Sequence, residues 1–354
     1  MSPGPRAATE GTWANTATSR CRAQRWQRDG EHTTRSSRSE RRAYADLLEM
    51  ILVKTILYGN HILVMALEKS CLLSKFRSYA DTVLSQLPAS SSKNDKSRII
   101  NTKLQAYRDD LILSSFPLGV TNLDDVLLIY YVSYIVMLEY RNKVWPYDYM
   151  SFSRRIGEIW EPFCKLPFIY PVNELRLYEP PSFSTIQNQM QKDAINYIDS
   201  LKLSDEEKNT LLNHYNKVWS LIDSESINLN LDLHVEYGEI YLDIDYKSGF
   251  SSNEKGNTNR LLMVAGIYNI MKGQHETMIF VRQKEDDNNH YLQTLKSSNL
   301  WKVYCAHEAY EKIKELSGFD IEQWMNTNMH WDKDISAEFK KYLEENDLMR
   351  YLEW

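Results

Sequence analysis

The chain has 354 residues, of which 43% are hydrophobic and 25% charged, and this balance is typical of folded globular proteins. Its formal net charge of −6 excludes a uniformly basic nucleic-acid-binding protein, so any phosphate contacts must come from local basic patches. The four cysteines form no CxxC pair. Their spacing argues against a structural zinc site or a disulfide framework and favours a reducing, cytoplasmic location.

No membrane association is expected from the sequence. The longest apolar run, Val126 to Leu138, is too short to cross a bilayer and is better interpreted as a buried helix. The first 40 residues contain no apolar core of the kind that a secretory signal requires.

Residues 1–43 differ in composition from the rest of the chain. They hold nine of the 19 arginines and none of the 23 lysines, and they have almost no aliphatic residues. Such a segment cannot bury enough apolar surface to fold, so we expect it to be disordered or a non-native extension. A basic arm that grips nucleic acid is the alternative interpretation.

Residues 44–184 are expected to form a mainly helical region. Apolar residues recur at helical spacing in three blocks, Ala45–Leu87, Asn101–Leu113 and Asp124–Tyr140. A polar linker, Pro88–Asp95, separates the first two blocks. Residues 145–184, rich in proline and aromatic residues, are expected to be irregular.

Residues 185–354 are expected to form an α/β (α+β) domain with a mixed sheet. Ser204 and Glu207 have the spacing of a capping box at the start of a helix. The expected helices are Ile186–Asp199, Asp205–Asp223, Thr258–Met271, His290–Lys296 and Glu308–Ser317, and the expected strands are Leu229–Val235, Ile240–Tyr246, Met278–Arg282 and Trp301–Cys305.

The first two strands are expected to pair as a β-hairpin. Gly238-Glu239 forms a natural two-residue turn, because glycine adopts the positive φ that a type II′ turn needs first. This turn sets the register: it places Asp232 opposite Asp245, His234 opposite Asp243, and Asn230 opposite Lys247, all on one face. The opposite face carries only apolar side chains.

The polar face of the hairpin has the residues that phosphodiester hydrolysis needs. Two carboxylates at cross-strand distance repel each other unless a cation or a proton lies between them. Carboxylate oxygens are hard ligands suited to Mg²⁺, and Lys247 projects from the same face as Asp245. The lysine could orient or deprotonate a metal-bound water, or offset charge on the scissile phosphate.

The pattern resembles the PD-(D/E)XK nuclease superfamily, in which an Asp is followed by a short hairpin and then by Asp-x-Lys. As in that superfamily, a helix precedes the pattern, and a helix and a strand follow it. The resemblance covers about a third of the chain, and Leu231 stands where the motif's Pro is expected. It implies a restriction-endonuclease-like core, a mixed central sheet flanked by helices, with Asp232, Asp245 and Lys247 as catalytic residues. It also implies that Asp232 and Asp245 bind Mg²⁺.

Two neighbouring features bear on this interpretation. Asp243 is a possible additional acid, since a merely solvated face would disperse three acids. The segment from Ser248 to Arg260 leads into a helix and suits phosphate contact. Its candidate DNA-binding residues are Ser251, Asn253, Lys255, Asn257, Asn259 and Arg260.

Each feature also has a simpler explanation. The acids and lysine can be an ordinary solvated face. Ser251 and Glu254 can form a capping box in a surface loop. His234 invites assignment as a general base, but a polar strand residue beside acids is the preferred interpretation. Arg282, Gln283 and Lys284 are weaker candidates for the same cleft.

The whole-chain layout resembles a type II restriction endonuclease, which implies cleavage of double-stranded DNA and a homodimer matched to symmetric sites. The sequence contains no GxxxxGK[ST] motif, so we do not expect an ATP-driven nuclease. The alternatives are a repair or recombination nuclease with the same core and a non-catalytic DNA-binding module.

Overall fold

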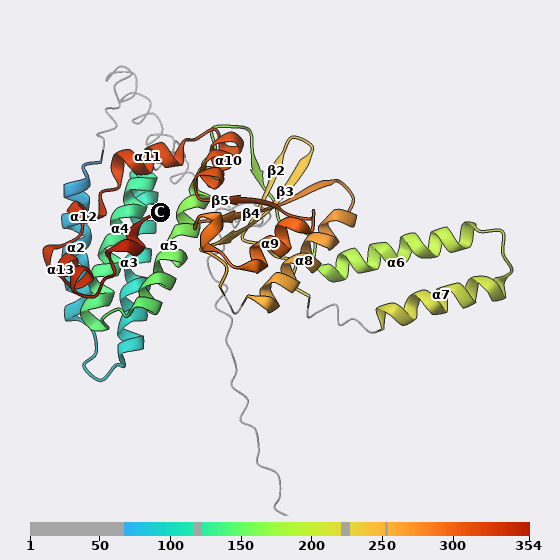
Figure 1. The fold of residues 1–354 in the computed structure, drawn as a ribbon, viewed down its shortest axis with the longest axis horizontal. Helices are drawn as coiled ribbons and strands as arrows, with labels where there is room; N and C mark the ends of the chain where they lie inside the picture. The colour runs from blue at the N-terminus through green and yellow to red at the C-terminus, as the bar shows by residue number, and fades with distance from the viewer. Residues whose placement is uncertain (1–66, 117–121, 221–226, 252–253) are drawn as a thin grey trace, which may run out of the picture. The chain divides into compact units, whose positions relative to one another are not determined.

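The N-terminal part of the described chain consists of successive helices (Figure 1). The computed structural model describes residues 67–116, 122–220, 227–251 and 254–354, so the segment 1–43 lies outside the described residues. The first helices are α2 (Lys69–Ser85), α3 (Lys93–Ser115), α4 (Leu123–Val144) and α5 (Tyr149–Ile169). Short polar side chains at Ser92, Asn122 and Asp148 cap the last three of these by accepting backbone N–H groups. The helical blocks and the linker near Pro88 are therefore confirmed where they are described.

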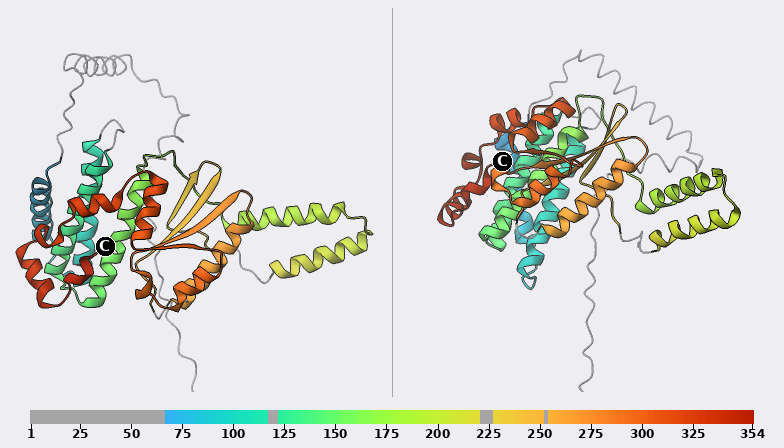
Figure 2. Two further views of the ribbon diagram at one scale, coloured as in Figure 1. Left: turned by 45° about the horizontal axis from the view of Figure 1, so that its top comes forward. Right: turned by 45° about the vertical axis from the view of Figure 1, so that its right-hand side comes forward.

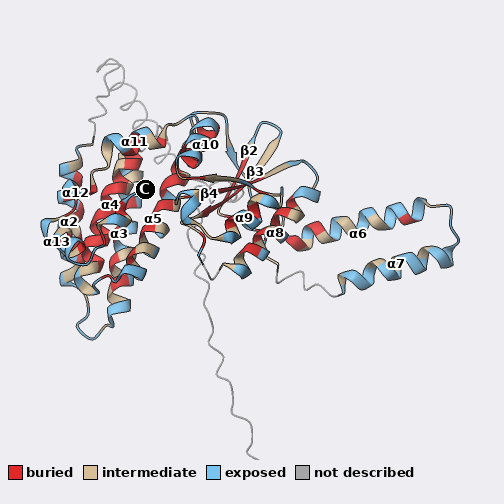
Figure 3. Ribbon diagram, in the orientation of Figure 1, coloured by how far each residue is buried: buried red, intermediate tan, exposed pale blue. Residues whose placement is uncertain are grey.

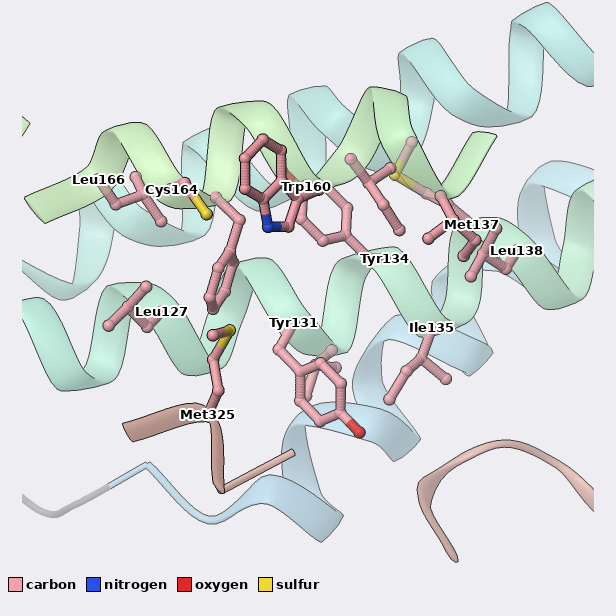
Figure 4. Packing of buried hydrophobic residues seen from close by; sticks show 14 of the residues in the cluster. Leu127, Tyr131, Tyr134, Ile135, Met137, Leu138, Trp160, Cys164, Leu166 and Met325 are labelled. Carbon is pink, nitrogen blue, oxygen red and sulfur yellow. The ribbon is translucent and has the colours of Figure 1, made fainter. Parts of the chain in front are cut away.

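Helix α4 lies at the centre of this region and buries 16 of its 22 residues. The long apolar run is therefore a buried helix, as expected. Figure 4 shows its side chains, among them Tyr131 and Tyr134, interleaved with Trp160 of α5 and with Met325 from the C-terminal part of the chain.

Helix α5 corrects the prediction that residues 145–184 are irregular, because it continues through Pro162 and Pro167. A proline inside a helix loses one hydrogen bond and costs about 3 kcal/mol. Burying one large apolar side chain contributes about 1.5–3 kcal/mol, and α5 buries nine residues, including Phe152, Trp160 and Phe163. Packing therefore outweighs the proline signal.

A mixed sheet follows, as the sequence predicts, but it has five strands in place of the four predicted, because the short first strand was not foreseen. Its strands are β1 (Arg176–Leu177), β2 (Leu233–Tyr237), β3 (Ile240–Lys247), β4 (Gln274–Val281) and β5 (Lys302–Cys305), in the spatial order β1-β2-β3-β4-β5. Strands β1, β2 and β3 pair antiparallel, whereas β3, β4 and β5 pair parallel. The parallel crossovers contain α8 (Lys255–Ile270) after β3, and η2 (Glu285–Asp287) with α9 (His290–Ser297) after β4.

The two faces of the sheet belong to different hydrophobic cores. Leu242, Ile244 and Phe280 face a core shared with α4, α5 and α10 (His307–Ser317). Ile279 and Val281, which alternate with Phe280, face a second core formed with α8, α9 and the start of α6 (Phe183–Ser200). The expected α+β class with helices flanking the sheet is confirmed.

Helix α6 continues beyond the second core and pairs with α7 (Asp205–Trp219). Two views show the pair extending away from the sheet, and none of the residues of α7 is buried (Figures 2 and 3). Ser204 and Glu207 form the expected capping box. The predicted end of this helix at Asp223 lies outside the described residues.

The C-terminal residues pack against the helical region and were not predicted as helices. They form α11 (Ile321–Asn328), α12 (Trp331–Asp334), α13 (Ala337–Glu345) and η3 (Met349–Leu352). Asp334 Oδ2 accepts hydrogen bonds from Lys69 Nζ at 2.7 Å and from the Tyr131 hydroxyl at 2.9 Å.

Among the described helices, none combines the length and the apolar character needed to cross a membrane.

Candidate active site

The hairpin adopts the predicted register. Strands β2 and β3 pair from Leu233–Ile244 to Tyr237–Ile240. Gly238 has a φ of 62°, in the left-handed region where a side chain is strained, which explains why the turn needs glycine at this position. His234, Asp243 and Asp245 consequently project from the face opposite to the aliphatic residues.

Strand β2 is shorter at its start than the sequence predicts. It begins at Leu233, so Asp232 lies one residue outside the ladder and Asn230 is not paired with Lys247. Instead, Asp232 Oδ2 accepts the backbone N–H of Tyr246 at 2.8 Å. This hydrogen bond holds the Asp232 carboxylate beside the end of β3, close to Asp245.

Asp245 is a buried carboxylate with two cations beside it. Its side chain is 1% exposed, it forms an ion pair with Lys247 Nζ, and Arg260 lies 3.8 Å away. Burial and then repulsion from Asp232 raise the pKa of Asp245, whereas Lys247 and Arg260 oppose the increase. Its Oδ2 receives no hydrogen bond of ordinary geometry despite the contact with Lys247. The structure therefore brings together Asp232, Asp245 and Lys247 as the sequence predicts, and adds Arg260.

Asp243 lies on the same face but has its own partners. Its fully buried carboxylate accepts hydrogen bonds from Tyr178, from His234 Nδ1 at 2.7 Å and from His275 Nδ1 at 2.8 Å. Burial alone would raise its pKa, but these hydrogen bonds outweigh burial and hold the pKa below its usual value. The second nitrogen of His234 accepts the backbone N–H of Leu231 at 3.1 Å, so this histidine is a structural residue of the network.

Sequence reasoning did not find Tyr178 or His275. Tyr178 follows a two-residue strand, which is too short to show a pattern of alternation. His275 lies near the start of β4, which begins four residues before the predicted Met278. No local signal extended the strand to His275, because the four residues from Gln274 to Thr277 are all polar.

The candidate DNA-binding residues in and before α8 lie only partly where the sequence analysis expects them. Arg260 reaches Asp245, while Asn257 donates to Glu254 at 3.0 Å. Ser251, Lys255 and Asn259 are exposed, and Asn253 lies outside the described residues. The alternative capping box is not formed, because α8 begins at Lys255 with Glu254 at its N-cap and no side-chain cap.

Arg282 does not reach the acidic face. Its guanidinium donates to Ser248 Oγ at 3.1 Å and to the backbone oxygen of Glu353 at 2.9 Å, which ties the end of β4 to the C-terminal residues. The nearby Gly157 of α5 is required for space, since a Cβ there would lie 2.8 Å from the Ser248 Cβ. Arg282 is thus a structural residue.

The carboxylates fit a hard divalent cation in their chemistry. Within the described ranges no group of three or more His, Cys, Asp or Glu side chains could hold a metal ion. Mg²⁺ needs fewer protein ligands, because it commonly binds one or two carboxylates together with waters and substrate phosphates. A cation beside Asp232 and Asp245 would relieve the repulsion that raises the pKa of Asp245.

Comparison of the chain with protein-family models, with curated proteins and with solved structures gives no match. The assignment of function therefore depends on the geometry of this face and on the resemblance of its sequence pattern.

Proposed function

We propose that the protein is a Mg²⁺-dependent endonuclease that hydrolyses phosphodiester bonds in double-stranded DNA, and that it acts as a sequence-specific type II restriction enzyme. The observation that carries the proposal is the convergence of Asp232, Asp245 and Lys247 at the end of one hairpin. The order of helix, hairpin, helix and strand around these residues also agrees with the PD-(D/E)XK resemblance.

The burial of Asp245 distinguishes this face from an ordinary solvated one. A carboxylate that serves only solubility remains exposed, whereas Asp245 is 1% exposed and faces a second carboxylate. Buried acids with perturbed pKa values and specific charged partners are typical of functional sites.

Each residue has a separate role in the proposed reaction. Asp232 and Asp245 would hold the metal, which when bound supplies a Lewis acid and lowers the pKa of a coordinated water. Lys247 Nζ is positioned to offset charge on the scissile phosphate or to take a proton from the attacking water. Arg260 lies at the edge of the site and is partly exposed, so it can contact a phosphate of the DNA backbone.

The proposal is tested by incubating plasmid and phage DNA with the full-length protein, with and without Mg²⁺. Asp245→Asn removes the charge at nearly constant volume, and Glu239→Gln in the exposed turn is the matched control. Discrete fragments from the wild type and the control, but not from Asp245→Asn, would support a restriction enzyme. Cleavage limited to branched or nicked DNA would favour a repair nuclease. If all three proteins leave every substrate intact, the nuclease proposal is wrong.

The proposed homodimer follows from the resemblance alone. Light scattering coupled to size-exclusion chromatography would measure the mass in solution. A mass of a single chain, both free and with a symmetric duplex, would contradict it.

A further inference from the structure

A second concave site lies in the helical region, where α3 begins, α4 ends and α5 begins. We call it the α3–α4–α5 pocket. Its volume is about 690 Å³, within the range of pockets that hold small ligands. The first turns of α3 and α5 both line it, and Ser97 and Ser151 come from these two helices. Helix N-termini carry partial positive charge, which favours an anion.

Arginine side chains dominate the charge of the pocket. Four arginines line it, against two carboxylates: Arg98, Arg141, Arg154, Arg155, Asp148 and Glu158. Both carboxylates are already engaged. Asp148 accepts the backbone N–H of Ser151 at 2.7 Å, and Glu158 is shared by Arg154 at 3.3 Å and Arg155 at 3.1 Å. Arg98 in turn pairs with Asp95 at 3.0 Å, so four arginines stand against three carboxylates and positive charge remains in excess.

Three buried polar atoms around the pocket make no hydrogen bond of ordinary geometry with a described residue: Arg155 Nη2, the Tyr147 hydroxyl oxygen and Asn101 Oδ1. Arg155 nevertheless lies close enough to the Tyr147 hydroxyl to oppose the increase in its pKa that burial causes. The Arg155 side chain is 17% exposed, and Tyr147 is almost fully buried. Buried polar groups are nearly always well paired, so the Arg155 guanidinium and the Tyr147 hydroxyl, two neighbouring donors, have capacity for a further acceptor. An anion accepts from the guanidinium and from the hydroxyl.

Arg141 adds a buried cation that forms no ion pair with a carboxylate among the described residues, although its guanidinium donates to the backbone oxygen of Trp145. Its guanidinium lies 3.9 Å from the ring centroid of Tyr147 and 4.9 Å from that of Trp145. Burial lowers the pKa of Arg141, Tyr147 and Asp148 oppose this decrease, and the charges of Arg155 and Arg154 add to it. Like charges held together in this way are stabilised by a bound anion.

We propose that the α3–α4–α5 pocket binds the phosphate group of a nucleotide-sized ligand. Guanidinium forks match phosphate oxygens in geometry, which favours phosphate over a spherical anion. Trp145, 39% exposed, supplies a ring on which a base can stack. A phosphate group of this kind can belong either to a free nucleotide or to a nucleotide within a DNA strand. The site is independent of the proposed nuclease reaction, because its residues are distinct from those of the hairpin.

The test measures binding to the full-length protein without divalent metal. Calorimetry is used with inorganic phosphate and with dAMP, and fluorescence anisotropy with a labelled single strand and a labelled duplex. Arg155→Gln removes the buried guanidinium. Arg154→Ala removes a side chain that is 78% exposed and leaves the core intact. Arg176→Ala is the matched control, since Arg176 is equally exposed and also pairs with one glutamate.

We expect Arg155→Gln and Arg154→Ala to weaken binding about tenfold or more, and Arg176→Ala to leave it unchanged. Loss of dAMP binding would support a free nucleotide as the source, and loss confined to the DNA probes would support a strand. DNA titrations are repeated with Arg260→Ala, so that binding at the hairpin face is separated from binding at the pocket. If no probe binds, or if folded Arg154→Ala binds every probe as well as the wild type, the proposal is overturned.

Discussion

Replacing Asp245 with Asn should make the protein more stable while abolishing cleavage. The ionised carboxylate is buried and lies beside Asp232, and its pKa is raised from 3.8 to about 6. Folding therefore disfavours the charged form at neutral pH. Asn has nearly the same shape and no charge, so the variant avoids the free-energy cost of burying the charged carboxylate.

The magnitude follows from the increase in pKa. Moving the pKa of one carboxyl from 3.8 to about 6 corresponds to about 3 kcal/mol against the ionised form at neutral pH. This value already includes the favourable interaction of the carboxylate with Lys247. We therefore expect the free energy of unfolding to rise by about 1–3 kcal/mol. Because folding raises the pKa of Asp245, the contribution of its protonated carboxyl to stability is fully present below pH 3.8. This stability is lost as the pH rises through about 6.

Urea unfolding at pH 7 in EDTA measures the difference, with Glu239→Gln as the control for a change of one charge. Mg²⁺ at tenfold its dissociation constant should then stabilise the wild type by about 1.4 kcal/mol and leave Asp245→Asn unchanged. A variant less stable than the wild type at pH 7, or equal stabilisation of both by Mg²⁺, would refute the reasoning.

Three further predictions concern the same hairpin. Lys247→Met should lower the cleavage rate about 100- to 1,000-fold with an unchanged near-UV circular dichroism spectrum, and a rate near wild type would exclude a catalytic role. Asp243 has a lowered pKa, so its stabilising effect should be present above about pH 4 and lost as the pH falls further. Acid unfolding of Asp243→Asn should show a weaker pH dependence than the wild type, and identical curves would contradict this. Gly238→Val should cost about 1–2 kcal/mol in urea unfolding because of the φ of 62°, whereas an unchanged midpoint would mean that the turn adapts.

The hairpin was predictable because two independent local signals agree. Strict alternation assigns the faces, and Gly238 fixes the register, so the pairing of Leu233 with Ile244 follows without knowledge of the rest of the chain. The start of β2 was missed because Asp232 continues the alternation, although its side chain accepts the N–H of Tyr246 outside the ladder.

Other features depend on contacts that a local pattern does not contain. Helix α5 persists through Pro162 and Pro167 because residues along its length, from Phe152 to Phe168, are buried against other elements. The approach of Arg260 to Asp245 depends on how α8 packs against the sheet, and the α3–α4–α5 pocket depends on the relative positions of three helices. Spacing in the sequence gives no distance between such residues.

The contact between Lys69 and Asp334 also constrains when the helical region can be completed. These two residues are separated by 265 positions, yet they join the first described helix to the C-terminal part of the chain. A ribosome releases α2 to α5 long before it releases α11 to α13, so the early helices leave it with part of their apolar surface uncovered. Non-local contacts of this kind slow folding and lengthen exposure to aggregation. Loss of the last residues by a premature stop would therefore harm the beginning of the fold as much as its end.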